Sequence, residues 1–194
     1  MRSSLDQFES VYDLYFATVY GHYRYLQNRF LNIAQAIQSF HRRKDQGTLL
    51  SKAEFRALKA EMKGCMQAFG DRIHPDIFET LESRLQFFNE YTLRERLVAL
   101  FPDDDQVLEG LTGGIPAFRD DIRHTRNYLT HYSVGEERKA TEGTALLRLT
   151  MRMQPALCRL LLQELGIPDE LTDAWIKRQA RRIDPIGSVW ETGE

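Results

Sequence analysis

Apolar residues recur every three or four positions along most of the chain, which is the spacing of an amphipathic helix. The first example runs from Leu5 to Val19, and after Gly21 the pattern resumes from Tyr23 to Phe40. The chain has no long alternating β-branched run and no Asn-Gly or Asp-Gly turn between such runs. The pattern therefore predicts an all-α fold that begins with one long helix or two stacked helices.

Caps and breakers divide the rest of the chain into further helices. Ser51 is placed to cap a helix that ends near Phe69, and Glu54 completes a capping box with it. Glycines, prolines and an acidic turn at residues 101–105 separate the later segments. Further helices are expected at residues 75–88, 92–100, 116–132 and 138–165, followed by a short amphipathic tail at residues 169–182. Together the periodic segments predict about six to eight helices.

Size and composition predict a single domain. The 194 residues are 42% hydrophobic, which is enough to bury one core. We expect one domain over residues 1–194, with its core at about 5–171 and a C-terminal tail at 172–194. No apolar run approaches the roughly twenty residues that cross a membrane. Because the N-terminus also lacks a secretory signal, we expect a cytoplasmic protein with no membrane partner.

Charge and cysteine usage exclude some functions. The net charge of -2 argues against a protein that coats nucleic acid by bulk electrostatics, so any polyanion would have to bind to a local basic cluster. Taken alone, each such cluster is more typical of a solvated helix face. Cys65 and Cys158 belong to no Cys-x-x-Cys pair, so they predict neither a disulfide framework nor a zinc site. We expect no cofactor.

The segment 116–132 carries the most informative chemistry. On an ideal helix its apolar side chains form one buried stripe of Ile115, Phe118, Ile122 and Leu129. Beside this stripe rises a basic flank of Arg119, Arg123 and Arg126. The side opposite the core is lined by Asp120, His124, Asn127 and His131. The flank and the opposite side together form one exposed polar wedge, on which groups that move protons lie beside groups that bind phosphate.

Arg126, Asn127 and His131 fit one reaction. Asn127 and His131 are four residues apart, so the amide can orient the imidazole by a hydrogen bond. Cleavage of RNA by its own 2′-hydroxyl needs a group of near-neutral pKa to move protons and a cation to stabilise charge on phosphorus. Histidine and arginine supply both, and no metal is required. Since one histidine does not easily act as base and acid on opposite sides of phosphorus, we expect a homodimer with the active site at its interface.

The run RNYLTHY at residues 126–132 resembles the signature of HEPN domains. In that signature an arginine is followed by a polar residue and, four to six positions after the arginine, by a histidine. From about residue 15 to about residue 171 the chain is similar to the ApeA-like branch, in the stretches 30–43, 93–97 and 160–166. The resemblance implies a HEPN-type helical bundle and metal-independent endoribonuclease activity that leaves a cyclic phosphate. Paired bundles would form the cleft.

The same resemblance implies a biological context. ApeA-like proteins are associated with bacterial antiphage defence, so we expect an effector of abortive infection. They usually carry a further domain ahead of the bundle, which implies an N-terminal sensor domain in a longer parent chain. One departure is Gln38, at a position where ApeA-like relatives tend to carry an acidic residue. That difference puts a carboxylate helper at this point in doubt.

The arginine-to-histidine spacing alone is weak evidence, because Arg119 and His124 satisfy it as well. The preference for Arg126 and His131 rests on the inserted Asn127, on the following Tyr132 and on the family-like segments around the motif. Five further residues are candidates for RNA contact or for support of the site: His41, Arg119, Arg123, His124 and Tyr132. RNA is the expected partner.

Another function class stays open. A catalytically inactive HEPN-like module could use the polar wedge to bind a nucleotide or a protein partner. Such a module has no reason to need an imidazole at position 131. A ferritin-like di-metal bundle is excluded, because none of the five histidines has a glutamate three residues before it.

Overall fold

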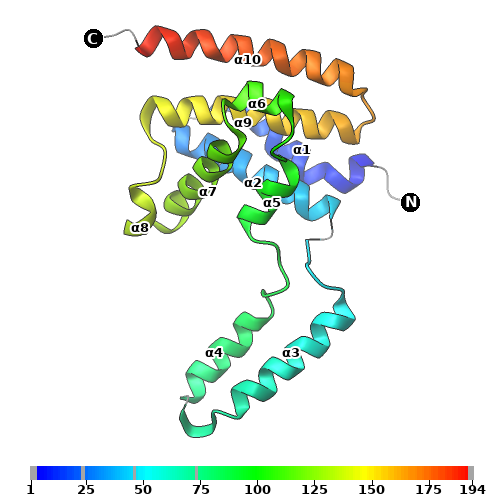
Figure 1. Cartoon of the computed structure of the whole chain (residues 1–194), viewed down its shortest axis with the longest axis vertical. Coiled ribbons are helices and arrows are strands. Elements are labelled where there is room, and N and C mark those ends of the chain that lie inside the picture. Colours follow the sequence, from blue (N-terminus) through cyan, green and yellow to red (C-terminus); the bar gives the residue numbers. More distant parts are fainter. Residues whose placement is uncertain (1–3, 23–24, 46, 73, 192–194) are drawn as a thin grey trace. The chain divides into compact units, whose positions relative to one another are not determined.

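The computed structural model describes residues 4–22, 25–45, 47–72 and 74–191. These residues form ten α-helices and no strand (Figure 1), which confirms the predicted all-α fold with more helices than expected. In chain order the helices are α1 (Ser4–Tyr20), α2 (Leu26–Lys44), α3 (Lys52–Gln67), α4 (Pro75–Leu85), α5 (Leu93–Leu100), α6 (Gln106–Thr112), α7 (Ile115–His131), α8 (Val134–Glu137), α9 (Gly143–Glu164) and α10 (Asp169–Glu191). None of these described helices is long and apolar enough to span a membrane.

The chain divides into two compact units. The main unit joins residues 1–44 to residues 93–194. The hairpin unit is residues 45–92, inserted between α2 and α5, and it contains α3 and α4.

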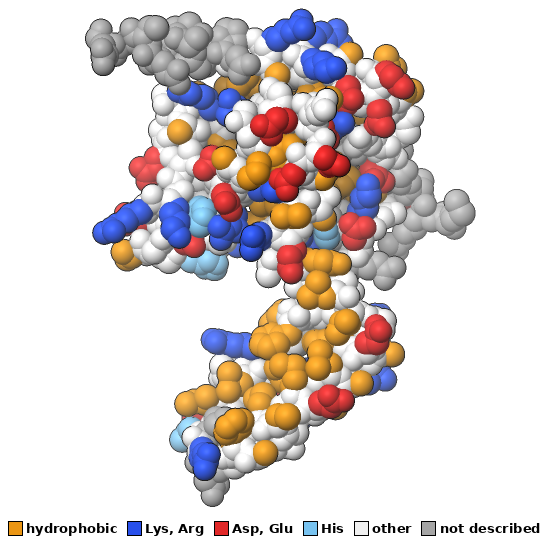
Figure 2. Space-filling view, in the orientation of Figure 1, with side chains coloured by type: hydrophobic (Ala, Val, Ile, Leu, Met, Phe, Trp, Pro, Cys, Tyr) orange, Lys and Arg blue, Asp and Glu red, His pale blue; other side chains and the backbone are white. Residues whose placement is uncertain are grey.

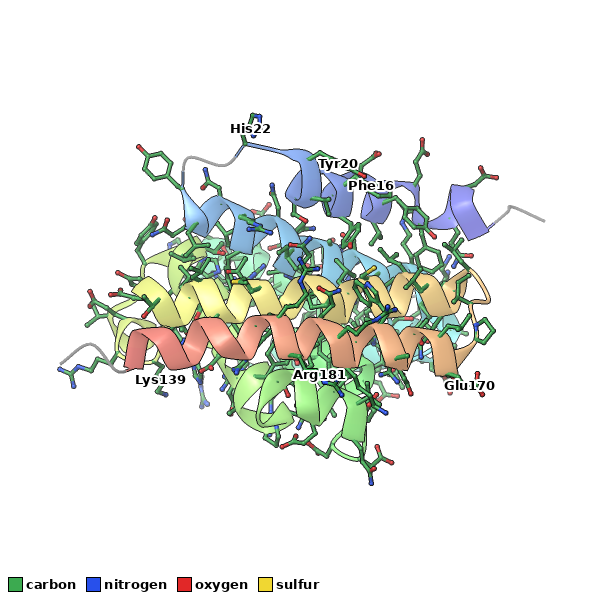
Figure 3. The ribbon with its side chains drawn as sticks, turned by 90° about the horizontal axis from the view of Figure 1, so that it is seen from above. Phe16, Tyr20, His22, Lys139, Glu170 and Arg181 are labelled. Carbon is green, nitrogen blue, oxygen red and sulfur yellow. The ribbon has the colours of Figure 1, made fainter. Side chains whose placement is uncertain are left out.

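The long helices of the main unit lie side by side. Seen from above (Figure 3), α1, α2, α9 and α10 follow one another in that order across the unit. The shorter helices α5, α6 and α7 pack on this layer, with α7 contacting α2, α5 and α9. Phe16 and Tyr20 lie on α1 and are exposed, as the same view shows.

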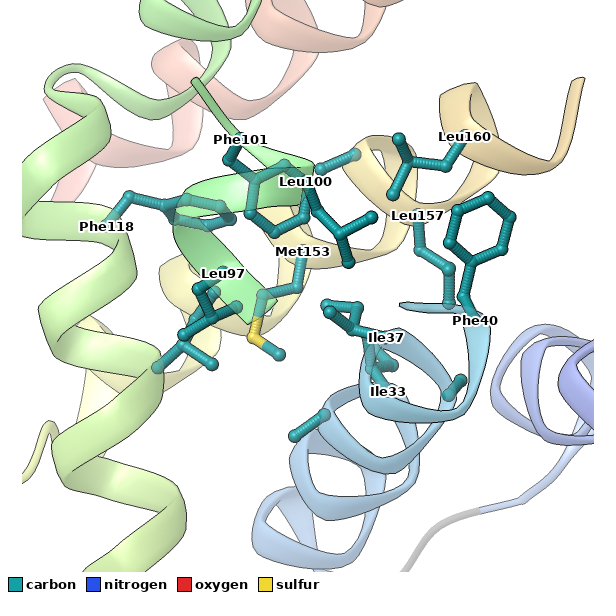
Figure 4. Packing of buried hydrophobic residues seen from close by; sticks show 14 of the residues in the cluster. Ile33, Ile37, Phe40, Leu97, Leu100, Phe101, Phe118, Met153, Leu157 and Leu160 are labelled. Carbon is teal, nitrogen blue, oxygen red and sulfur yellow. The ribbon is translucent and has the colours of Figure 1, made fainter. Parts of the chain in front are cut away.

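The core of the main unit is formed where α2, α5, α7 and α9 meet (Figure 4). The buried side chains at its centre are Ile33, Ile37 and Phe40 of α2, Leu97 and Leu100 of α5, Phe118 of α7, and Met153 and Leu157 of α9. On α2, α5 and α9 these residues are three or four positions apart, so each helix buries one face. The hydrophobic spacing of the sequence thus corresponds to the observed core.

The helix expected at residues 138–165 is observed as α9, which begins at Gly143, later than expected, and the short α8 lies before this segment. Gly143 has a φ of +54°, a left-handed conformation that helical backbone does not adopt. The amide of Thr141 donates to the hydroxyl of Thr125 over 2.9 Å, which ties the connecting segment to α7. Pro155 lies inside α9 as expected and is buried.

The tail expected from residue 172 onward continues instead as α10. Thr172, Ile176 and Ile183 are buried, and α10 packs against α9 and α6. This helix therefore belongs to the core of the main unit.

One cation joins three helices of the main unit. Arg159 of α9 is buried and donates from Nε to Asp173 of α10 over 3.1 Å. Its Nη1 pairs with Asp105, the N-cap residue of α6. Burial opposes the charge of this guanidinium, but the two carboxylates outweigh it and raise the pKa of Arg159. The ion triad fixes the positions of α6, α9 and α10 relative to one another.

The hairpin unit is built from local signals. Its predicted capping box is confirmed: the Ser51 hydroxyl accepts from the Glu54 amide over 3.3 Å, and the Glu54 carboxylate accepts from the Ser51 amide over 3.0 Å. A 3₁₀ turn at Gly70–Arg72 follows α3. The Asn89 side chain bonds both backbone groups of Leu50, at 2.7 and 3.0 Å, which closes the base of the hairpin.

Replacing Arg159 by alanine should lower the free energy of unfolding by about 2–4 kcal/mol, because two half-buried carboxylates lose their common counter-charge. Urea unfolding followed by circular dichroism measures the change. Arg178→Ala, at an exposed position of α10, is the matched control and should stay within about 0.5 kcal/mol of wild type. An Arg159 variant as stable as this control would contradict the structural role of the triad.

Candidate active site

Helix α7 is positioned by its ends and by its buried stripe. Gly113 and Gly114 precede it with φ values of +71° and +141°, and Pro116 lies in its first turn. The Cβ of any other residue at Gly113 would lie 3.7 Å from the guanidinium of Arg152. The predicted stripe is buried at Ile115, Phe118 and Ile122, and Leu129 packs against its edge. This packing turns the opposite side of the helix toward solvent.

The three predicted catalytic residues lie near the C-terminal end of α7. Arg126 and Asn127 are half-buried, and His131 is exposed at the last position of the helix. Nη1 of Arg126 donates to Oδ1 of Asn127 over 3.3 Å. The amide therefore binds the guanidinium of Arg126, whereas we expected it to bind the imidazole of His131. Within the described part of the chain, the ring of His131 makes no hydrogen bond or ion pair. Its nitrogens are therefore open to a substrate.

The ring of His124 is held on both sides. Nε2 lies 2.7 Å from Nη2 of Arg123, and Nδ1 lies 2.5 Å from a carboxylate oxygen of Glu136 in α8. Because a guanidinium only donates, Nε2 accepts, and the proton on Nδ1 is donated to the carboxylate. This hydrogen bond lowers the pKa of Glu136. In this arrangement His124 links α8 to α7.

Sequence reasoning missed Glu136. Ser133 and Glu136 have the spacing of a capping box, and Ser133 is indeed the N-cap of α8. The side chain of Ser133 makes no cap hydrogen bond, however, and the Glu136 carboxylate bonds His124 of α7. The local signal existed but indicated a different partner.

The other arginines of the basic flank are paired with carboxylates. Arg119 donates to the carbonyl of Phe101 over 2.8 Å and to Asp103 over 2.5 Å, which ties α7 to the acidic turn. Arg123 forms an ion pair with Asp120 over 3.0 Å. Arg126 has no carboxylate partner among the described residues. Of the three flank arginines, Arg126 is thus the one whose charge is not already neutralised.

His41, a candidate for RNA contact or support, lies inside the main unit with 1% of its surface exposed. Nη1 of Arg96, which is equally buried, approaches Nδ1 of His41 to 3.3 Å. Since the guanidinium donates, Nδ1 of His41 accepts this hydrogen bond. The pair links α2 to α5 in the interior of the main unit. His41 can therefore support the fold, but it does not face solvent where RNA could bind. Gln38, the departure from the family pattern, is half-buried on α2 and bonds the Ala34 carbonyl over 3.4 Å.

Tyr132 ends α7 in a left-handed conformation, with a φ of +49°. Its ring is exposed and packs edge-on against Tyr128, with centroids 5.6 Å apart. A cavity of about 520 Å³ opens beside both tyrosines and is also lined by Asn28 and Glu142. Burial, with Glu137 and Glu142 nearby, raises the pKa of Tyr128. Aromatic and polar walls of this kind can accept a stacked base.

Among the described residues, the polar wedge of one chain offers a guanidinium without a carboxylate partner at Arg126 and an open imidazole at His131. Such a pair can bind a phosphate and move one proton. In the part of the chain that the structure describes, no group of three His, Cys, Asp or Glu side chains is placed to hold a metal ion.

An all-α bundle that exposes an arginine and a histidine near the end of one helix corresponds to the HEPN class of domains that the sequence resembles. The sequence model of the Apea-like HEPN family matches residues 31–171, well over half of the chain and including the hairpin unit. The chain therefore belongs to the Apea-like HEPN family. Searches among curated proteins and among solved structures found no match.

Replacing Glu136 by alanine should release α8 from α7 and speed amide hydrogen exchange at residues 133–141. Since the pKa of Glu136 is lowered in the folded protein, its stabilisation is complete above the unfolded carboxyl pKa and is lost as pH falls through the folded value. The difference in unfolding free energy between wild type and Glu136→Ala should therefore be present at neutral pH and vanish in acid. Glu170→Ala, at an exposed position of α10, should show no such pH-dependent difference.

Proposed function

We propose that the protein is a metal-independent endoribonuclease that cleaves RNA through attack of its own 2′-hydroxyl and acts in antiphage abortive infection. The proposal rests on one observation: Arg126 is free of carboxylates and His131 is open to solvent on the same helix of an Apea-like HEPN domain. Family membership supports the reaction class. The role in defence follows from the resemblance alone.

The proposed reaction needs two proton transfers and no cofactor. A neutral imidazole removes the proton of the 2′-hydroxyl, and the 2′-oxygen forms a bond to phosphorus. The bond from phosphorus to the 5′-oxygen breaks, and an imidazolium donates a proton to that leaving oxygen. The products are a 2′,3′-cyclic phosphate and a 5′-hydroxyl. Arg126 would stabilise the extra negative charge on the phosphoryl oxygens in the transition state.

A homodimer would supply the second proton carrier. His131 of one copy would be the base and His131 of the other the acid, with an Arg126 from each side. The exposure of His131 at the end of α7 supports this arrangement, because a second copy could approach the ring without unfolding the helix. Tyr128 and Tyr132 are placed to stack a neighbouring base beside the cleaved bond.

A second candidate is a catalytically inactive HEPN-like module that binds a nucleotide or a protein partner. The observation in its favour is that Asn127 engages Arg126, so no described side chain orients the imidazole of His131. In a binding module the wedge would hold a phosphate with Arg126 and need no proton carrier. The first experiment below separates the two candidates.

The wild-type protein, incubated with end-labelled single-stranded RNA in excess chelator, should produce cyclic-phosphate ends. Arg126→Ala and His131→Ala should each reduce the cleavage rate by at least about a hundredfold, because each removes a group that acts in the transition state. The matched control is His22→Ala, which alters an exposed histidine that is far from His131 in the sequence, and this variant should cleave like wild type. Circular dichroism verifies that all variants fold.

Two outcomes would overturn the assignment. Cleavage that persists in His131→Ala but is lost in His124→Ala would transfer the proton carrier to the other histidine. RNA binding without cleavage by the wild type would favour the inactive module.

Mixing experiments test the shared active site. After subunit exchange with an equal amount of His131→Ala, random pairing leaves about half of the wild-type chains in wild-type dimers. Activity per wild-type chain should then fall to about half and approach zero with a large excess of the variant. Sites that are complete within one chain would instead give an activity that the variant does not change.

A further inference from the structure

One side of the hairpin unit is apolar and exposed. The seam between the two helices is formed by half-buried positions at Phe55, Lys59, Met62 and Met66 on α3 and at Phe78 and Glu82 on α4, with Leu85 fully buried and Lys63 half-buried at its edge. Exposed apolar residues directly precede four of these seam positions: Leu58 and Cys65 on α3, and Ile77 and Leu81 on α4. We call these four residues the apolar face of the hairpin.

The apolar face lies on one side of both helices. In an antiparallel pair of right-handed helices, the residues that precede the seam point to the same side of the pair. Lys63, which follows a seam position, pairs with Glu82 over 2.6 Å, so a charged contact covers the other side. Figure 2 shows hydrophobic side chains gathered along the hairpin, where Leu58 is 41% and Ile77 is 55% exposed.

The hairpin unit does not bury enough apolar surface by itself. Among its described hydrophobic residues, Leu85 is the one that is buried, and α3 has no buried residue. The stability of an amphipathic helix comes mainly from covering its apolar side. Phe69 and Phe88, just beyond the ends of α3 and α4, are also more than half exposed. The hairpin therefore needs a cover.

The charges beside the apolar face indicate which partner would bind to it. On the side of the apolar face, the residues that precede the other three seam positions are charged and exposed: Glu54 and Glu61 on α3, and Arg84 on α4. A surface with one basic and one acidic half is complementary to itself after a two-fold rotation. If the two-fold axis runs parallel to the helices, α3 lies on the partner's α4 and opposite charges meet. If the axis lies across the helices, α3 lies on the partner's α3 and like charges meet.

We propose that the apolar face binds the same face of a second copy of this chain, with α3 of each copy lying on α4 of the other. The product is an antiparallel four-helix bundle, in which neighbouring helices all run in opposite directions. The inference concerns self-association through residues 45–92 and does not depend on RNA cleavage. It assigns to the inserted hairpin the role of a dimerisation arm.

Sedimentation equilibrium of the whole chain tests the proposal. Wild type should self-associate, and Leu58→Lys combined with Leu81→Lys should weaken the association by roughly a hundredfold or more, because lysine ammonium groups would enter an apolar interface. The control, Ala57→Lys with Ala60→Lys, adds the same charges at exposed positions of α3 outside the apolar face and should associate like wild type. A monomeric wild type, or a double-lysine face variant that associates like the control, overturns the proposal.

A cross-linking experiment tests the stacking without introducing charge. The pairing of Lys63 with Glu82 places Cys65 and Leu81 at a similar height along the hairpin. One chain carries Cys158→Ala and keeps Cys65; the other carries Cys158→Ala, Cys65→Ser and Leu81→Cys. Mild oxidation of their mixture should give a covalent heterodimer on a non-reducing gel. A dimer joined through two copies of Cys65, or no covalent heterodimer, overturns the arrangement with α3 on α4. Neither experiment measures cleavage, so its failure is distinct from failure of the nuclease proposal.

Discussion

The packing of α7 into the core of the main unit determines what the rest of the molecule can do. Ile115, Phe118 and Ile122 are buried against the neighbouring helices, and this fixes the rotation of α7 about its own axis. Once that rotation is set, the helical repeat decides which polar side chains meet solvent. A shift of one residue in this packing would turn His131 by about a quarter of a turn toward its neighbours. The chemistry of the wedge thus depends on a purely apolar interaction.

The charged groups of the wedge differ in whether they are already bound to other parts of the main unit. Arg119 and the Arg123–His124–Glu136 chain are engaged with the acidic turn and with α8, and they hold the two neighbouring segments of α7 in place. Arg126 is left without a carboxylate, so its charge can act on a phosphate. A guanidinium already paired with a carboxylate would have to lose that partner before it could bind an anion. The structural ion pairs therefore increase the difference between Arg126 and the other arginines, although sequence spacing alone treats them alike.

Local signals predicted well what depends on a few consecutive residues, such as the Ser51 capping box, the ends of α7 and its buried stripe. Contacts across the chain were not predictable in this way. His41 lies in the last turn of α2, and its buried neighbour Arg96 on α5 is brought next to it only by tertiary packing. Asn127 lies four residues from His131 and next to Arg126, and spacing cannot decide between two partners within reach. The late start of α9 at Gly143 depends on a backbone conformation that glycine permits but does not require.

The proposed dimer places opposite physical requirements on the surfaces of the two units. A wedge that carries an unpaired arginine repels its own copy, so charge alone cannot hold two wedges together. The free energy of association must come from apolar surface removed from water, which contributes roughly 25 cal/mol per Å². The hairpin has such a surface at Leu58, Ile77 and Leu81, all well exposed, while the wedge remains polar. In the proposed dimer, association through the hairpin would leave the imidazole of His131 open, because no apolar contact would have to cover it to make the dimer stable.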